Sequence, residues 1–264
     1  MKITVVGETA SVIPEDHPFF VDGGGPVNVD YDPAGAELVA EFIGRSRTHL
    51  IWRGHDGKQD TREFLHFLLS SSAWRIFEHS YVTLFAEEVP VSLGYLLRAR
   101  REFAVDERPQ RRTRFDRFDI PPAIPEEVGD DDELRTALHD LHEQSIQVWT
   151  MLQSARVSYA DSGRDTDGDT YPEDRRAVAR AALLNMTVTN LTLTGNFRSW
   201  ARFLVDCDSP REEPDMQRFA TSVGTIFADR YPAVFGPVRF AVWDVDKAEK
   251  WAWANRSGRA MKPP

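Results

Sequence analysis

The chain has 264 residues, of which 41% are hydrophobic and 11% aromatic, and this is enough apolar material for a sizeable folded core. Its formal net charge of −10 argues against a nucleic-acid-coating surface, which needs a broad basic face. No apolar run approaches the roughly 20 residues of a membrane helix, and no signal peptide is recognisable. The single cysteine, Cys207, fits a reducing compartment. We therefore expect a cytoplasmic protein that contacts neither membrane nor nucleic acid.

Two helices are predicted in the first third of the chain. The first begins at Asp32, a suitable N-cap, continues with Pro33 at the first helical position and ends near Gly44. The second begins at Asp60 and ends in the serines at 70–72. Each has an apolar face that we expect to be buried, formed by Leu38, Val39, Phe42 and Ile43 in the first helix and by Phe64, Phe67 and Leu68 in the second.

Strands alternate with these helices. Runs of β-branched and aromatic residues predict strands at 3–6, 80–85 and 187–194. Pro90 ends the second strand and begins a helix, whose inner face is formed by Leu93, Leu96 and Leu97.

Besides a helix that opens with Arg175, Arg176 and Arg180, three further helices are predicted in the second half. One follows the acidic run at 130–133, Asn196 caps another, and the last ends at Pro232. Their apolar positions are Leu134, Leu138, Leu141, Val148, Trp149 and Leu152 in the first, Phe197, Trp200, Phe203 and Leu204 in the second, and Met216, Phe219, Val223, Ile226 and Phe227 in the third. We therefore expect one α+β domain over residues 1–264, with variable extensions at about 1–30 and 237–264.

Two patterns are typical of metal ligands, but each is incomplete. His139 and His142 lie three residues apart on a predicted helix, without a carboxylate or cysteine at a matching spacing. The alternating aspartates at 165–169 resemble a calcium loop, yet the position of its final glutamate is Arg176. We expect no metal site.

The densest group of arginines lies between Gly94 and Arg112. On charge alone, two interpretations remain open. The arginines can form a solvated basic face, as charge runs commonly do. They can also bind an anion, because the guanidinium fork matches phosphate and carboxylate oxygens.

The residues around this stretch resemble the flavin-dependent thymidylate synthase family. Glu78-His79 is followed by a strand and then by Arg98-Ala99-Arg100. The family has a Glu-His pair, a strand and Arg-Gln-x-x-Arg-His-Arg, and the spacing fits without a gap. Downstream, Arg180 with Leu183-Leu184 and then the segment 194–200 resemble the family's arginine before Leu-Pro and its Thr-x-Asn-x-Arg at a helix start. Together these blocks cover most of the chain.

The resemblance implies a fold and a reaction. The fold is a set of helices packed on a small, mostly antiparallel sheet. In the reaction, C5 of a uridine monophosphate (UMP or dUMP) is methylated with methylenetetrahydrofolate as carbon donor and with FAD, reduced by NADPH, as hydride source. The family uses no protein nucleophile, and its members are homotetramers with sites at subunit interfaces.

The resemblance also implies roles for single residues. Substrate contacts are implied for Tyr95, Arg98, Glu107, Arg111 and Arg180. Cofactor contacts are implied for Glu78, Arg98, Arg100, Asn196, Arg198 and Arg202. Within these sets, Arg98 bridges nucleotide and flavin.

The chain also departs from the family at several positions. They are Tyr95 for glutamine, Ala99 for the central histidine, Phe103 for a serine, Ala73 and Arg75 for a histidine and a threonine, and Cys207 for the arginine that helps to ionise the uracil. Three alternatives follow. The protein is a C5-methylase with altered substrate choice, with UMP as candidate, an ordinary dUMP enzyme with a divergent site, or a paralogue that binds nucleotide or flavin without turnover.

Overall fold

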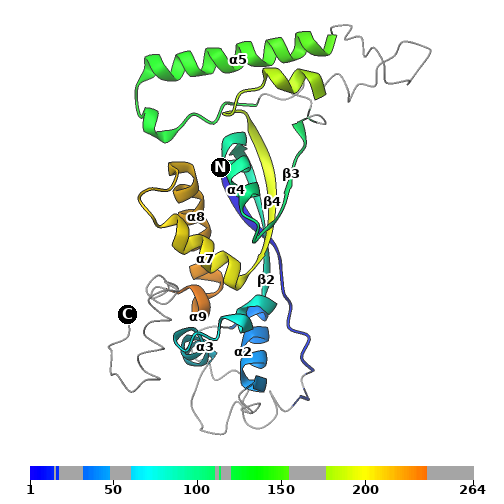
Figure 1. Ribbon diagram of the computed structural model, residues 1–264, viewed down its shortest axis with the longest axis vertical. Coiled ribbons are helices and arrows are strands. Elements are labelled where there is room, and N and C mark those ends of the chain that lie inside the picture. Colours follow the sequence, from blue (N-terminus) through cyan, green and yellow to red (C-terminus); the bar gives the residue numbers. More distant parts are fainter. Residues whose placement is uncertain are drawn as a thin grey trace, which may run out of the picture. The chain divides into compact units, whose positions relative to one another are not determined.

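The computed structural model describes residues 1–14, 16–17, 32–47, 61–110, 113, 120–154 and 177–236. Four strands form one sheet in the order β1-β2-β4-β3, namely β1 (Lys2–Glu8), β2 (Tyr81–Pro90), β4 (Val188–Asn196) and β3 (Ala104–Glu107) (Figure 1). The helices are α2 (Gly35–Arg47), α3 (Thr61–Ser70), α4 (Val91–Ala99), α5 (Asp132–Ser154), α7 (Phe197–Cys207), α8 (Pro214–Arg230) and α9 (Pro232–Phe235).

Contacts between β2 and β4 show that these strands run antiparallel. The hydroxyls of Thr83 and Thr194 lie 2.9 Å apart, and the N–H of Glu88 donates to Asn190 Oδ1 at 3.3 Å, so residue numbers fall along one strand as they rise along the other. The predicted α+β class, with a small antiparallel sheet, is confirmed. The predicted domain bounds stay a prediction, because the internal contacts group the chain into two compact units, described separately below.

The first unit comprises 1–4, 85–101 and 105–193. Its helix α4 follows Pro90 as predicted and buries Val91, Leu93 and Leu97. The prediction for Leu96 was wrong, because its side chain is exposed.

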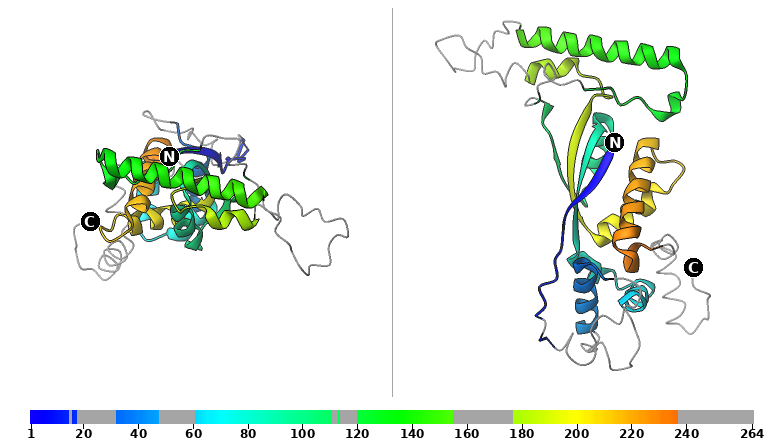
Figure 2. Two further views of the ribbon diagram at one scale, coloured as in Figure 1. Left: turned by 90° about the horizontal axis from the view of Figure 1, so that it is seen from above. Right: turned by 180° about the vertical axis from the view of Figure 1, so that it is seen from behind.

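Helix α5 of this unit packs through a narrow stripe. Trp149 is fully buried beside Ala179, and the hydroxyl of Ser145 donates to the carbonyl of Ala182 at 2.6 Å. Figures 1 and 2 show α5 lying beside the segment that ends in the turn over Arg180–Ala182. The predicted apolar face of α5 is only partly buried. The buried stripe also contains His142 and Ser145, and three residues of the predicted face stay exposed: Leu134, Leu141 and Val148.

The second unit comprises 5–84, 102–104 and 194–264. Helix α2 begins at Gly35 rather than Pro33, continues beyond Gly44 to Arg47 and buries a face that sequence periodicity did not predict. Three charged residues, spaced four apart, are buried instead of the predicted apolar ones: Glu37, Glu41 and Arg45. Glu41 and Arg45 can be buried because they are paired with each other, whereas Glu37 accepts hydrogen bonds from backbone N–H groups. Arg45 Nε donates to Glu41 at 2.9 Å, and the hydroxyl of Thr61 donates to the same carboxylate at 2.8 Å.

Aromatic side chains fill the core of the second unit. Buried rings of α7, α8 and α9 meet mostly edge to face, with centroids between 5.0 and 6.4 Å apart. The predicted faces of α7 and α8 are confirmed, except that Ile226 is only half buried. On α3, Phe64 and Leu68 are buried as predicted, whereas Phe67 is 52% exposed.

Phe103 belongs to this core. It lies 4.3 Å from the ring of Trp200, and a Cβ at Gly195 would come within 2.6 Å of the Phe103 ring. Only glycine at position 195 therefore leaves room for this phenylalanine. The residue that stands where the family has a serine packs in the core and is 8% exposed.

Within the described residues, no helix is both long and apolar enough to cross a membrane, and no group of three metal-ligating side chains occurs. Asp60, the aspartates at 165–169 and the tail after Pro237 lie outside the described residues.

Candidate functional site

The residues implied as site residues divide between the two units. In the first unit lie Tyr95, Arg98, Arg100, Glu107 and Arg180. In the second lie Glu78, Asn196, Arg198 and Arg202. Arg111 lies outside the described residues. Each unit is considered by itself.

Arg98 is held between a carboxylate and an aromatic ring. Its guanidinium Nη1 forms an ion pair with Glu107 Oε2 at 2.8 Å, and its Cζ lies 4.8 Å from the centre of the Tyr95 ring. The Glu107 side chain is only 9% exposed, whereas that of Arg98 is 41% exposed. The carboxylate is therefore the fixed partner, and Arg98 presents a charged, oriented group to solvent.

The local sequence explains this arrangement. Tyr95 and Arg98 lie three residues apart in the last turns of α4, so their side chains share one helix face. Glu107 lies on β3, where alternation turns it and Val105 to the more buried side. Gly94 lies beside the Glu107 carboxylate, since a Cβ at this position would be 3.8 Å from Glu107 Oε1.

Two other arginines of this unit were also predicted to bind ligands, namely Arg100 and Arg180. The N–H of Arg100 donates to the carbonyl of Leu97 and ends α4, which makes Arg100 a helix terminus as well as a predicted cofactor contact. Arg180 is exposed in a 3₁₀ turn over Arg180–Ala182. Their predicted binding roles stay predictions.

In the second unit, Asn196 and Arg198 begin α7. The side-chain oxygen of Asn196 accepts the N–H of Ser199 at 2.8 Å, which confirms the predicted cap. Arg198 forms an ion pair with Glu78, and both side chains are more than 40% exposed. The Glu-His motif and the Thr-x-Asn-x-Arg motif therefore meet through these two charged groups.

A groove of about 640 Å³ opens beside Arg198. It is lined by Gly44, Arg47, Phe67, Leu68, 71–73, Trp74, Arg75, Ile76 and Arg198. Sequence reasoning did not place Arg47 or Arg75 in a site. A possible signal was Arg75 itself, an arginine three residues before Glu78 at a family position held by threonine.

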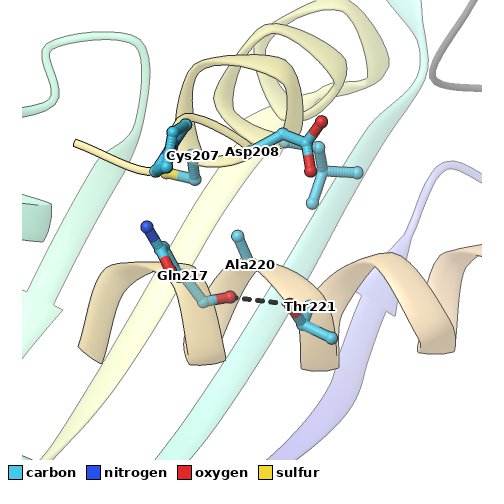
Figure 3. Close-up of a pocket in the computed structure, with 7 residues that line it drawn as sticks. Cys207, Asp208, Gln217, Ala220 and Thr221 are labelled. Atoms are coloured by element: carbon cyan, nitrogen blue, oxygen red, sulfur yellow. Dashed lines mark hydrogen bonds between the residues drawn. The ribbon is translucent and has the colours of Figure 1, made fainter. Parts of the chain in front are cut away.

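A smaller hollow of about 250 Å³ lies between α7 and α8. Figure 3 shows Cys207 and Asp208 at the end of α7, across from Gln217 and Thr221 of α8. The Cys207 side chain is buried. Arg202 lies five residues earlier on α7, about 140° around the helix, and it is exposed with Asp206 as its ion-pair partner at 3.9 Å. Arg202 therefore does not occupy the place of Cys207.

Carboxylates elsewhere in this unit serve the fold. Burial raises the pKa of Glu37 to about 7, although the N–H groups of Ala34 and Ala233 donate to its two oxygens. A two-pronged hydrogen bond from Arg230 holds the pKa of Glu8 below its usual value.

Comparison with known proteins shows which family this chain resembles. A family model described as thymidylate synthase complementing protein matches residues 29–233. A flavin-dependent thymidylate synthase of Mycobacterium avium is 25% identical over 245 residues, 91% of either chain. Similar enzymes of Corynebacterium efficiens and Mycobacterium tuberculosis are 24% and 25% identical and cover 78% and 89% of this chain, and 81% and 88% of their own.

Proposed function

Because the chain belongs to the thymidylate synthase complementing protein family, we propose that it is a flavin-dependent methyltransferase acting on C5 of a pyrimidine nucleoside monophosphate, UMP or dUMP. Methylenetetrahydrofolate donates the carbon, and bound FAD, reduced by NADPH, supplies the hydride. The side chains of the protein bind and orient these molecules and polarise the pyrimidine. We place this reaction in the cytoplasm.

The observation that carries the proposal is the oriented guanidinium of Arg98. Glu107 engages one end of it at 2.8 Å, and the Tyr95 ring limits its rotation. The remaining N–H donors of the guanidinium suit a nucleotide phosphate or a uracil carbonyl, both of which accept hydrogen bonds.

Tyr95 supports an altered choice of substrate. Glutamine, the residue of the family at this position, offers an amide donor and an amide acceptor, whereas Tyr95 offers a ring that stacks on Arg98. Contacts to the nucleotide beside Arg98 therefore differ from those of the family. We propose UMP as the preferred substrate, with dUMP as the alternative.

The residues of the second unit fit a flavin. Asn196 uses its side-chain oxygen in the helix cap, which leaves its amide N–H groups for a ligand. Arg198 lines the groove with a partly exposed guanidinium. We assign Glu78, Asn196 and Arg198 to the cofactor.

A specific observation favours a second candidate, a paralogue that binds nucleotide or flavin without turnover. Cys207 stands where the family has the arginine that helps to ionise the uracil, and its buried thiol provides no positive charge. Arg202, on another side of α7, does not replace that charge.

We also propose a homotetramer with its sites at subunit interfaces. Leu134, Leu141 and Val148 are exposed at every seventh residue of the 23-residue helix α5, a spacing that suits packing against another helix. We expect Leu141→Glu to lower the mass measured by light scattering to that of a smaller species. An unchanged mass would show that this face is not an interface, and Glu143→Gln on the same helix is the control.

The spectrum of the purified protein tests the function. We expect yellow protein with flavin absorbance, released as FAD on denaturation. Colourless protein that takes up no added FAD would exclude both the altered and the ordinary enzyme.

A further inference from the structure

Helix α5 buries polar side chains while apolar ones stay exposed. Along the described part of this helix, only His142, Ser145 and Trp149 are buried, although three apolar residues of its predicted face are exposed. Both buried polar side chains contact main-chain carbonyl oxygens. His142 Nε2 lies 2.9 Å from the oxygen of Ile120, and the Ser145 hydroxyl donates to that of Ala182 at 2.6 Å. A helix that packs only for stability buries its apolar residues, so these hydrogen bonds indicate a more specific use.

The Ser145 hydrogen bond supports the 3₁₀ turn over Arg180–Ala182, which carries an arginine predicted to contact the substrate. The turn has three residues and is closed by a hydrogen bond to the carbonyl of Arg180. So short a 3₁₀ turn is only weakly stable by itself. Ser145 satisfies the carbonyl of its last residue, and Trp149 packs against Ala179, the residue just before it. Helix α5 therefore holds the turn at both ends, while the Arg180 side chain between them is exposed.

The chain that leaves this turn is hydrogen-bonded to helix α4. Two N–H groups at the start of α4 donate to its carbonyls, namely Val91 to Thr187 at 3.0 Å and Ser92 to Asn185 at 3.2 Å. The same helix carries Arg98 in its last turn. Both arginines predicted to contact the substrate from this unit are therefore attached to one hydrogen-bonded framework, which α5 supports.

We infer that Ser145 is a positioning residue for substrate binding, which acts together with the packing of Trp149 by holding the turn that carries Arg180. This inference rests on the proposed function and on the substrate contact predicted for Arg180. An arginine on a loosened turn is in its binding position for only part of the time. The apparent affinity for the nucleotide then falls by that fraction. Ser145 and Trp149 act on the nucleotide through Arg180.

The affinity for nucleotide tests this role. The full-length protein, with FAD added, is titrated with UMP and dUMP by isothermal calorimetry. For Ser145→Ala we expect the affinity for the bound nucleotide to fall about two- to fivefold, because one neutral hydrogen bond to the turn is lost. Ser145→Thr keeps a hydroxyl and should retain most of the affinity. Thr136→Ala, which removes an exposed hydroxyl of the same helix, is the matched control and should bind normally.

A double-mutant cycle with Arg180→Ala separates positioning from a general structural role. Arg180→Ala alone should lower the affinity about tenfold, as when a charged hydrogen bond is lost. In its background Ser145→Ala should have no further effect, because the turn then carries no guanidinium.

Equal losses for Ser145→Ala with and without Arg180 would overturn the inference, and so would unchanged affinity of Ser145→Ala or of Arg180→Ala. If the unaltered protein binds UMP or dUMP in these cases, the proposed function stands. An unaltered protein that binds neither nucleotide overturns both.

Discussion

Two guanidinium–carboxylate pairs, one in each unit, differ in how firmly they are anchored. Glu107 is almost buried, with 9% of its side chain exposed, and its partner Arg98 is also stacked on a ring. Glu78 is 41% exposed, and its partner Arg198 is 46% exposed at the edge of a groove. An exposed ion pair contributes little to stability, whereas a nearly buried carboxylate is costly to leave unpaired.

The difference suggests different uses for the two arginines. Arg98 is oriented before any ligand arrives, so binding does not have to restrict its side chain further. Arg198 can exchange its exposed carboxylate for a ligand anion at small cost. The first pair therefore suits a substrate that must be placed accurately, and the second suits a cofactor that must be admitted.

Arg98→Ala should have the largest effect on binding. Removing the guanidinium leaves Glu107 without its partner and the nucleotide without its cation, so we expect UMP and dUMP affinity to fall at least about a hundredfold. Isothermal titration measures this directly. Arg135→Ala, which removes an exposed arginine of the same unit, is the control, and near-normal affinity of Arg98→Ala would refute the role of Arg98.

Glu37 extends the comparison to a carboxylate whose hydrogen bonds come from backbone N–H groups. Its pKa of about 7 in the folded protein lies above the unfolded value of 4.5, so the folded state binds the proton more tightly. The stabilisation is complete below pH 4.5 and is lost as pH rises through 7, by up to about 3 kcal/mol. We expect the urea concentration at the unfolding midpoint to decrease as the pH is raised from 5 to 7.5.

Glu37→Gln should flatten this dependence, because the amide does not titrate. The titration of Glu8 does not interfere with this test. Because the pKa of Glu8 is lowered, its effect on stability is confined to acidic pH, where stability decreases as pH decreases. A variant with the same slope as the unaltered protein would show that another group is responsible.

Glu107→Gln and Glu78→Gln compare the two anchors directly. We expect Glu107→Gln to lower the free energy of unfolding by about 1–2 kcal/mol, because the ion pair of a nearly buried carboxylate is lost. Glu78→Gln should change it by less than about 1 kcal/mol. Chemical denaturation of both variants gives the values, and a larger loss at Glu78 would reverse the proposed difference.

Tyr95 should have the smallest effect on affinity. Tyr95→Phe keeps the ring beneath Arg98 and should bind nucleotide normally, whereas Tyr95→Leu should lose about two- to fivefold in affinity. Tyr95→Gln, which restores the family residue, should raise kcat/KM for dUMP relative to UMP. An unchanged ratio would show that Tyr95 does not select the sugar.

Local patterns predicted the elements well where local physics decides them. The cap at Asn196 and the buried faces of α7 and α8 follow from residues that are close in sequence. The buried face of α2 could not be predicted in this way, because Glu37 is buried against the N–H of Ala233, 196 residues away. Helix α5 was predicted, but half of its predicted apolar face is exposed, because periodicity does not say what the face packs against.

The site was predictable only in part for a similar reason. The motifs located Arg98, Arg198, Glu107 and Glu78, but not the pairing of Arg98 with Glu107 and of Arg198 with Glu78, because each pair joins separate elements. Arg47 and Arg75 come to one groove from segments that no motif joins. Phe103 could be recognised as a change from serine, but its packing against Trp200 beside Gly195 depends on the folded core.

Release of tritium from C5 of labelled UMP and dUMP tests the central claim most directly. The protein is supplied with FAD, NADPH and methylenetetrahydrofolate, and Arg98→Ala is the matched inactive control. We expect release that depends on all three additions and is faster with UMP. Release only from dUMP would contradict the altered substrate choice, and no release from either nucleotide by flavin-loaded protein would contradict the enzyme itself.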